Sequence, residues 1–293
     1  MQENVQLLVS GIQNGIAYSL VGLALVLIYK TSRALNFAQG TMAGFAGYAA
    51  YELIVTNGWP WFFGAIGGVV VAALLGLACE RIAIRPLLGA PLLSLVIATI
   101  AVDSILANVT QLRFGTDVKA FPRVWEGNDF TVLGINVGRS YVIIGIVTLF
   151  ILAGLAFLLQ KTKFGIAMRA FADDQYAAEL MGIPPARVSR VVWVLSLMIG
   201  GITGILFAPL LFLQLGYMSG VFIKGFTAAV VGGFTSLGGS VLGGLLLGVL
   251  EAFCIKYAPS PQWAAMLPLL LILVVLLIKP NGIFARGEAV KRV

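Results

Sequence analysis

The chain has 293 residues, of which 60% are hydrophobic and only 11% are charged, whereas an ordinary soluble domain is about 25% charged. Its 12 acidic and 19 basic side chains are too few to cover a soluble protein of this size, so the soluble classes are excluded and lipid is the expected solvent. The net charge of +7 is typical of bases retained in cytoplasmic loops, and the absence of histidine excludes imidazole zinc sites, Ser-His-Asp triads and histidine proton relays.

The first apolar run, residues 5–29, is predicted to be a retained membrane helix. It is too long for the apolar region of a signal peptide, and the residues before it carry an acid and no base. The later apolar segments are 36–56, 61–79, 91–112, 140–160, 190–213, 221–235, 239–256 and 262–279. Because a spanning helix needs about 20 apolar residues, the sequence predicts an all-α integral membrane protein with about 8–9 transmembrane or re-entrant helices.

The distribution of basic residues predicts the orientation of the chain. If the amino terminus is outside, the inside loops are 30–35, 80–90, 161–190, 236–238 and 279–293. Of the 19 basic residues, those left outside or near it are Arg113, Lys119, Arg123, Arg139, Lys224 and Lys256. Because lysine and arginine accumulate in cytoplasmic loops, we predict an external amino terminus and a cytoplasmic carboxyl terminus.

Glycines interrupt the region 221–256 at positions 232–233 and 238–239. The two segments either cross the membrane fully or are half-helices that meet inside it, and both alternatives return the chain to the same side. A second glycine-rich segment, around Gly40 and Gly44, would run in the opposite direction in the amino-terminal half. Glycine-interrupted segments in both halves indicate an inverted repeat around a central pathway.

The chain is predicted to form a single transmembrane domain, residues 1–293, because no linker or low-complexity tract divides it. Its longest external loop is 113–138, which contains Trp125. Its longest internal loop is 161–189. The two large loops therefore lie on opposite sides of the membrane.

The internal loop carries the most specific pattern in the sequence. Helix formers run up to Gly182, which stands at the position of a helix C′ residue, and two prolines follow as stops. Asp173 and Asp174 are suited to cap a second short helix, on which Ala177 and Ala178 would give a small-residue face. The residues alone leave two interpretations open: a helical pair on which another protein docks, or an ordinary solvated connecting helix.

Asp103 is the ionisable side chain deepest inside a predicted span, and such groups are functional candidates because lipid disfavours their charge. We expect it to meet Thr99 one turn earlier, while Ser104 and Asn108 are neighbours at i and i+4. Two roles stay open for this group: it lines a hydrated pathway, or it forms a buried polar cluster that fixes helix packing.

Polar residues also mark the two glycine-rich segments. Asn36, Gln39 and Thr41 begin the first, and Thr235 and Ser236 lie in the second. They are candidates for contacting a permeant near the membrane midplane, or they cap helices, since Asn and Ser favour that position.

Three further charges need no functional role at this stage. Glu52 and Glu251 lie toward the outer ends of their segments, where snorkelling to water explains them. Lys224 is expected to be an interfacial anchor.

Three blocks of the sequence resemble one transporter family. The blocks are residues 35–40 (LNFAQG) with Gly44 and Tyr48, residues 165–183 (GIAMRAFADDQYAAELMGI) followed by Gly201 and Gly204, and residues 230–239 (VVGGFTSLGG) followed by 242–244 (LGG). In this order, and over nearly the whole chain, they resemble the branched-chain amino-acid permease family of ABC importers. The chain looks most like the first of that family's two homologous permease types.

A shorter motif agrees with this resemblance. The run Ala177-Ala178-x-x-x-Gly182 is similar to the Glu-Ala-Ala-x-x-x-Gly coupling loop of ABC importer permeases. Tyr176 stands in the place of the glutamate, and the later Ile-x-Leu-Pro part of that pattern is absent. By this resemblance, the ATPase-coupling residues would be Gly165, Arg169, Ala170, Asp174, Ala177, Ala178 and Gly182.

The resemblance implies a transporter subunit and not an enzyme. It would form the membrane pathway for branched-chain or related amino acids in the inner membrane of a bacterial cell. Its partners would be a homologous second permease, two ABC ATPases and an extracytoplasmic binding protein that delivers the substrate, with no nucleic acid. ATP and Mg would bind the ATPases, since this chain has no Gly-x-x-x-x-Gly-Lys-Ser/Thr run, and no cofactor is expected in it.

Two other functions stay open on the sequence. One is an ion-coupled secondary transporter, in which Asp103 carries the coupling ion or proton. The other is a urea- or sugar-type permease of the same superfamily, which would share the fold and the coupling loop. A membrane enzyme is disfavoured, because we find neither a metal cluster nor a nucleophile–base pair.

Overall fold

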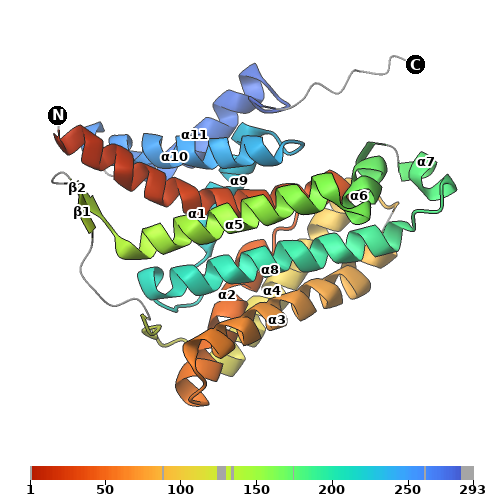
Figure 1. Ribbon diagram of the computed structural model, residues 1–293, viewed down its shortest axis with the longest axis horizontal. Coiled ribbons are helices and arrows are strands. Elements are labelled where there is room, and N and C mark those ends of the chain that lie inside the picture. Colours follow the sequence, from red (N-terminus) through yellow and green to blue (C-terminus); the bar gives the residue numbers. More distant parts are fainter. Residues whose placement is uncertain are drawn as a thin grey trace.

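A computed structural model describes residues 2–87, 89–123, 130–132, 135–173, 175–260 and 262–284 and confirms a helical membrane architecture (Figure 1). The first half contains α1 (Gln2–Ser32), α2 (Gln39–Tyr51), α3 (Trp61–Cys79), α4 (Leu92–Phe114) and α5 (Arg139–Lys161). The second half contains α6 (Lys163–Asp173), α7 (Gln175–Leu180), α8 (Pro185–Leu211), α9 (Ser219–Gly232), α10 (Leu237–Tyr257) and α11 (Gln262–Ile278).

Two helices continue into wider π-helical turns. One extends α2 over Glu52–Thr56, and the other extends α3 over Glu80–Ile84 and leads into a short 3-10 turn, Arg85–Leu87. Residues 113–138, the loop predicted to be external, contain an antiparallel hairpin of β1 (Phe130–Val132) and β2 (Ile135–Val137). Trp125, in the same loop, lies outside the described residues.

Each apolar segment predicted from the sequence contains a helix, but the helices differ in length. Six described helices are long and apolar enough to cross a membrane: Glu3–Ser32, Trp61–Leu87, Leu92–Phe114, Arg139–Lys161, Pro185–Leu211 and Leu237–Tyr257. At 1.5 Å per residue, the 14 residues of α9 span only about 21 Å, which is less than the about 30 Å of a hydrocarbon core. Length and composition alone thus support six spans, whereas the sequence predicted about 8–9 transmembrane or re-entrant helices.

Helix α1 lies at the centre of the molecule and packs against α8, α9 and α10. Its contact with α10 requires glycine on both sides. A Cβ atom added at Gly248 would lie 2.3 Å from the carbonyl oxygen of Gly11, and one added at Gly15 would lie 2.7 Å from the Cα of Leu245. These glycines let the two backbones touch, which is how membrane helices gain packing energy without a hydrophobic driving force.

Small residues also form the contact between α3 and α8, called here the α3–α8 seam. A Cβ atom added at Gly76 would lie 2.9 Å from the carbonyl oxygen of Trp193, and one added at Gly201 would lie 2.6 Å from the Cβ of Ala72. The two helices therefore approach closely along the seam, where Ile205 and Leu197 of α8 also contact Gly68 and Gly76 of α3.

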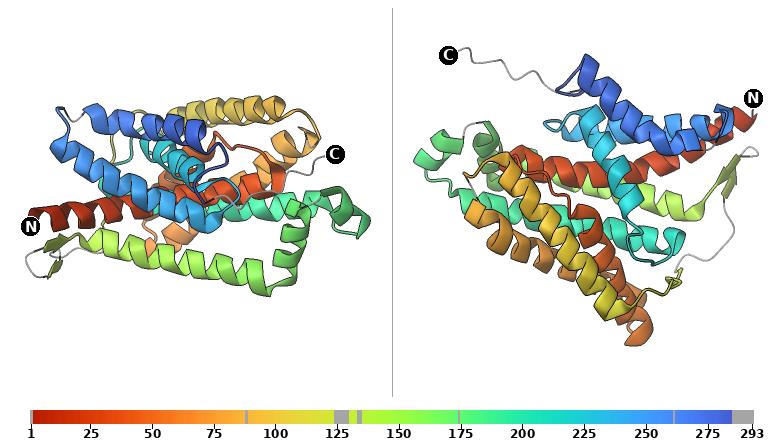
Figure 2. Two further views of the ribbon diagram at one scale, coloured as in Figure 1. Left: turned by 90° about the horizontal axis from the view of Figure 1, so that it is seen from above. Right: turned by 180° about the vertical axis from the view of Figure 1, so that it is seen from behind.

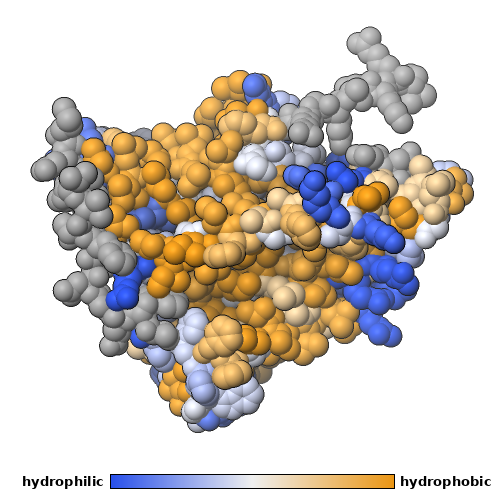
Figure 3. Space-filling model, viewed as in Figure 1, coloured by the Kyte–Doolittle hydropathy of each residue, from blue (hydrophilic) through white to orange (hydrophobic). Residues whose placement is uncertain are grey.

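The two ends of the bundle differ in charge. One end holds the last turn of α1, the π-helical turn after α3, the pair α6–α7 and the start of α8 (Figures 1 and 2). The basic residues of these segments are Lys30, Arg33, Arg81, Arg85, Lys161, Lys163, Arg169, Arg187 and Arg190. Figure 3 shows hydrophobic side chains across the middle of the molecule and hydrophilic ones gathered at this end.

Candidate functional site

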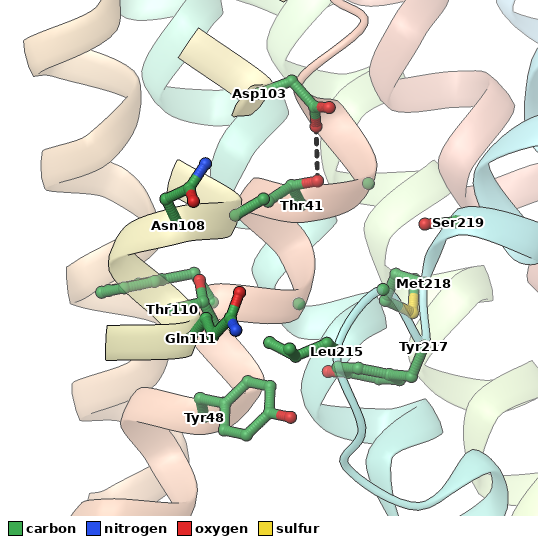
Figure 4. A pocket seen from close by; sticks show the side chains of 15 residues that line it. Thr41, Tyr48, Asp103, Asn108, Thr110, Gln111, Leu215, Tyr217, Met218 and Ser219 are labelled. Atoms are coloured by element: carbon green, nitrogen blue, oxygen red, sulfur yellow. Dashed lines mark hydrogen bonds between the residues drawn. The ribbon is translucent and has the colours of Figure 1, made fainter. Parts of the chain in front are cut away.

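A cavity of about 240 Å³ is lined by α2, α4 and the turn Leu215–Ser219 that precedes α9. Figure 4 shows the side chains around it, and the view from behind in Figure 2 shows α4 and α9 on the same face of the molecule. Pockets for drug-sized ligands measure about 300–1,000 Å³. The smaller cavity found here suits a small metabolite.

Glycines on α2 explain how the turn before α9 comes so close. A Cβ atom added at Gly40 would lie 2.9 Å from the Cβ of Phe222. One added at Gly47 would lie 2.1 Å from the hydroxyl oxygen of Tyr217. The glycine-rich pattern of this segment therefore serves the approach of the turn to α2.

Asp103 stands at one wall of the cavity, where its carboxylate accepts a hydrogen bond from the hydroxyl of Thr41 on α2 (Figure 4). The sequence predicted a partner one turn earlier, and this prediction is wrong. Thr99 is fully buried and donates instead to the backbone carbonyls of Leu35 and Val96. The two residues differ because Thr99 lies on the packed side of α4, whereas Asp103 is only half-buried and lines the cavity.

Polar side chains continue from Asp103 along an exposed flank of α4. Asn108 and Gln111 line the cavity and are exposed, and Ser104 is exposed on the same helix. The amide of Asn108 donates a 2.8 Å hydrogen bond to the carbonyl oxygen of Ser104, so the predicted neighbours do interact. We call Ser104, Asn108 and Gln111 the polar flank of α4.

Two tyrosines form the inner wall of the cavity. The ring of Tyr48 stacks on Phe114 with centroids 5.0 Å apart and meets Tyr217 edge-on at 6.4 Å. Tyr217 donates a 2.9 Å hydrogen bond to the carbonyl oxygen of Gly204. The buried hydroxyl of Tyr48, in contrast, has no hydrogen-bond partner among the described residues, so it is available to an occupant of the cavity.

The lining can bind both ends of a small zwitterion. The carboxylate of Asp103 attracts an ammonium group, while the amides of Asn108 and Gln111 can donate to a carboxylate. Phe45 and Leu215 add apolar surface. None of the described residues that line the cavity is basic, so a lone anion would find no countercharge there.

The other residues predicted for the pathway lie elsewhere. Asn36 and Gln39 are 1% exposed and bond each other at 2.9 Å, and Gln39 also donates to the carbonyl oxygen of Ser196. Ser236 caps α10 by accepting a hydrogen bond from the backbone N–H of Gly239 at 3.0 Å. Thr235 lines separate cavities beside the basic end of the bundle. Of the predicted set, the structure brings together Thr41, Asp103 and Asn108.

Glu251 and Lys224 form an ion pair that the sequence did not predict. Glu251 is 6% exposed and does not reach water; it pairs with the ammonium group of Lys224 and accepts a 2.8 Å hydrogen bond from Tyr18. Lys224 is therefore half of a partly buried ion pair that joins α1, α9 and α10, and its side chain remains 26% exposed. Glu52 is partly exposed and pairs with Arg113.

At the basic end, the chain turns sharply from α5 into α6. Thr162 caps α6 by accepting a 3.1 Å hydrogen bond from the backbone N–H of Gly165. A Cβ atom at Gly165 would lie 2.3 Å from the carbonyl oxygens of Leu158 and Leu159. The sharp turn between α5 and α6 therefore requires glycine at position 165. Two further residues predicted to couple to the ATPase lie on α6. Ala170 is half-buried, whereas Arg169 is exposed and lines a cavity with Lys30.

Helix α7 confirms the helical pair predicted for the internal loop. Gly182 ends it with φ +82°, and the backbone N–H of Ile183 donates to the carbonyl oxygen of Ala178 at 3.0 Å, as expected for a glycine C′ residue. The predicted small-residue face is divided, because Ala177 is exposed while Ala178 is 4% exposed and packs in the core. Asp174 lies outside the described residues.

The sequence did not reveal the apolar surface that α7 exposes. Tyr176, Leu180 and Met181 are 73%, 71% and 82% exposed, although they lie at the charged end of the bundle. Exposed apolar patches rimmed by polar residues mark interaction sites. We call these three residues the α7 patch.

The cavity residues Tyr48, Gln111, Leu215 and Tyr217 were also absent from the predicted pathway set. Helical spacing could have indicated two of them, since Tyr48 lies two turns after Thr41 and Gln111 two turns after Asp103. No local pattern predicts that the turn before α9 reaches the same cavity, because that contact joins segments far apart in the chain.

The chain is similar in sequence to known permeases over almost its whole length. A family model described as the permease component of the branched-chain amino acid transport system matches residues 7–276. The high-affinity branched-chain amino acid transport system permease protein LivH of Escherichia coli (strain K12) is 30% identical over 98% of this chain and 97% of its own length. BraD, with the same description, of Pseudomonas aeruginosa is 31% identical over the same shares. The probable permease LivH of Methanocaldococcus jannaschii is 32% identical over 93% and 91%.

The match covers the cavity, the internal helical pair and the long helices that connect them. The chain therefore belongs to the branched-chain amino acid transport system permease family.

Proposed function

We propose that this chain is the permease subunit of an ATP-driven importer and forms the membrane pathway for branched-chain or related amino acids. The relatives are permease components of branched-chain amino acid transport systems and not enzymes, which supports transport as the function. The proposal assigns the substrate pathway to particular residues because a mixed polar and apolar cavity lies between α2, α4 and the turn before α9.

An aliphatic amino acid fits the chemistry of this cavity. Its ammonium group would pair with Asp103, which Thr41 already orients. Its carboxylate would accept hydrogen bonds from Gln111 and the hydroxyl of Tyr48, and its side chain would contact Leu215. The cavity needs no high affinity, because an extracytoplasmic binding protein would supply selection before the substrate enters.

The polar flank of α4 supports a second permease subunit at this face. Its three side chains are exposed on a helix that is long and apolar enough to cross the membrane. Polar groups facing hydrocarbon are costly. A second permease opposite the flank would replace lipid with protein and water, and the cavity would become one half of a central pathway.

The α7 patch supports docking of the ATPases at the basic end of the bundle. The patch lies on the helical pair that resembles a coupling loop, and its exposed apolar side chains would bury against an ATPase subunit. ATP and Mg would be held by those partners. Movement of the pair on ATP binding would then reach the pathway through α8, which follows α7 directly.

The distribution of charge supports the orientation. The end that carries α6 and α7 holds nine of the 16 basic residues in the described part of the chain, which favours a cytoplasmic position for it and an external amino terminus. We assign the chain to the bacterial inner membrane, with 8–9 transmembrane or re-entrant helices built on the six long ones and an inverted repeat of the glycine-rich segments.

The proposal is tested with the complete complex, co-purified with its ATPases and second permease and reconstituted in proteoliposomes with its binding protein. Uptake of radiolabelled leucine that requires internal ATP, and that excess valine but not fructose or urea suppresses, is the expected result. Uptake driven by a proton or sodium gradient without ATP would instead establish a secondary transporter. Preference for the sugar or urea would reassign the substrate class.

A further inference from the structure

A buried carboxylate lies at the basic end of the α3–α8 seam without a hydrogen bond. The side chain of Glu80 is 0% exposed, and neither of its oxygens has a hydrogen-bond partner among the described residues. Its ion-pair partner is Arg190, whose Nε atom is 3.9 Å away. Charge-assisted hydrogen bonds measure about 2.7–2.9 Å, so the two groups are close but not joined.

Donors that could satisfy this carboxylate lie on α8 and are equally unsatisfied. The hydroxyl of Ser189 and the Nε–H of Arg190 are buried and without hydrogen-bond partners among the described residues, and so is the indole N–H of Trp193 one turn further along. The hydroxyl of Ser189 lies within reach of the Glu80 carboxylate, and the guanidinium groups of Arg190, Arg85 and Arg81 act on its charge. Acceptors and donors of matching chemistry therefore face one another across the seam, and a buried charge is stable only when it is paired and hydrogen-bonded.

The local backbone gives these groups room to rearrange. Glu80 is the first residue of the π-helical turn, and its carbonyl oxygen accepts from the backbone N–H of Arg85, five residues later. Such turns insert one residue into a helix and are frequent at functional sites. Ser189 also lines a cavity of about 190 Å³, together with Thr31 of α1 and Phe171 of α6.

The seam itself permits sliding. The contacts around Gly76 and Gly201 are made mainly by backbone and Cβ atoms, so a small shift of α8 along α3 would require few side chains to rearrange, Ile205 against Gly68 among them. Small sliding of packed helices is an established form of conformational change. A movement of α7 would be transmitted to the start of α8. Ile183 is hydrogen-bonded to Ala178 of α7, and α8 begins two residues after Ile183.

We propose that Glu80 is a switch residue that has two partner states. In the state described here the carboxylate has Ser189 and Arg190 nearby but makes no hydrogen bond of ordinary geometry with either. In a second state of the transport cycle, α8 slides along α3 and brings Ser189 and Arg190 into hydrogen bonds with Glu80. The proposal rests on the proposed function, because the partner ATPases would drive the sliding through α6 and α7. Glu80 is thus a positioning residue and touches no substrate.

The test measures uptake per ATP hydrolysed in the reconstituted complex. Glu80→Gln and Arg190→Gln are each expected to lower this ratio by at least about tenfold, the value of one hydrogen bond to a charged group, while ATP hydrolysis continues. The double variant should be no worse than either single one, because the same interaction is lost. Glu52→Gln is the matched control: Glu52 begins the other π-helical turn and pairs with Arg113, and the ratio should not change.

A second measurement follows the sliding directly. Spin labels at Ile82→Cys and Arg187→Cys, both exposed positions, in a Cys79→Ala, Cys254→Ala background should report two distances that a non-hydrolysable ATP analogue interconverts. Glu80→Gln should abolish the second distance. If this variant does not assemble, Ser189→Ala removes a donor without removing a charge and should lower uptake per ATP in the same direction.

The outcomes separate this proposal from the proposed function. A wild-type complex that hydrolyses ATP without any uptake would remove the importer assignment and leave no cycle for the switch to act in. A wild-type complex that couples the two, with an unchanged ratio in Glu80→Gln, Arg190→Gln and Ser189→Ala and a single spin-label distance, would overturn the switch alone.

Discussion

The hydroxyl of Tyr217 donates a 2.9 Å hydrogen bond to the carbonyl oxygen of Gly204 and thereby ties the turn before α9 to α8. The bond exists because Gly47 of α2 leaves space for the hydroxyl. A Cβ atom there would lie 2.1 Å from the hydroxyl oxygen, and the next nearest atom of the same ring would be 3.3 Å away. The Tyr217 hydroxyl and the absence of a side chain at Gly47 thus hold α2, α8 and the turn before α9 together at the cavity.

Gly47→Ala is expected to abolish most uptake, because the new methyl group displaces Tyr217 from the cavity wall. Tyr217→Phe should cost only the net value of one hydrogen bond, about 0.5–1.5 kcal/mol. The informative variant combines them: removing the hydroxyl relieves the clash, so Gly47→Ala/Tyr217→Phe should recover part of the uptake and thermal stability lost in Gly47→Ala. A double variant as impaired as Gly47→Ala would show that the clash is not the cause.

Asp103→Asn keeps the size of the side chain and its contact with Thr41 but removes the charge that would attract an ammonium group. We expect the apparent affinity for leucine uptake to fall by about tenfold or more, as for loss of a hydrogen bond to a charged group. Ser94→Ala changes a polar residue near the start of α4 that does not line the cavity, and should stay near wild type. Initial rates over a range of substrate concentrations check both, and equal kinetics would return Asp103 to a packing role.

Replacing two residues of the α7 patch, Leu180→Ser and Met181→Ser, is expected to weaken association with the ATPases, because the apolar area that would be buried against them is lost. The protein should still insert, since both side chains are exposed. Recovery of the ATPases with the tagged permease measures the effect. Arg187→Ser, at the same end but outside the patch, is the control; full recovery of the ATPases with all three variants would exclude the patch from the interface.

Lys224→Met leaves the carboxylate of Glu251 buried without its cation. Breaking a buried pair costs about 3–5 kcal/mol, and the value here should be lower because the side chain of Lys224 is 26% exposed. Lys224→Met/Glu251→Met removes both charges and should recover much of the lost thermal stability in detergent. A double variant less stable than the single one would mean that the pair contributes net stability beyond avoiding a lone charge.

The sequence correctly predicted the features that depend on residues close together in the chain, namely where helices lie and end. Apolar runs located every long helix, and the glycine and prolines after α7 correctly located its end. The failures lie where the partner of a residue is distant in the chain. Thr99 is the polar residue one turn before Asp103 on α4, but the side chain that bonds Asp103 is Thr41, 62 residues away.

The same reason explains the errors at Glu251 and Asn36. Distance from the end of a helix predicted a snorkelling Glu251, yet the tertiary contact with Tyr18, 233 residues away, buries it. Asn36 had the right residue type for a polar pathway, but α8 supplies the carbonyl that holds its partner Gln39 inside. Neither the spacing nor the composition of a helix predicts which of its faces will be buried by a segment that lies far away in the chain.

The central position of α1 has a consequence for how the protein is made. This helix leaves the ribosome long before α8, α9 and α10, the helices whose surfaces cover it. Its glycine surface at Gly11 and Gly15 must therefore stay in lipid without a partner while most of the chain is translated. Final assembly is then a late rearrangement of already inserted helices, and a nascent chain interrupted before α10 would keep its oldest segment exposed to quality-control proteases.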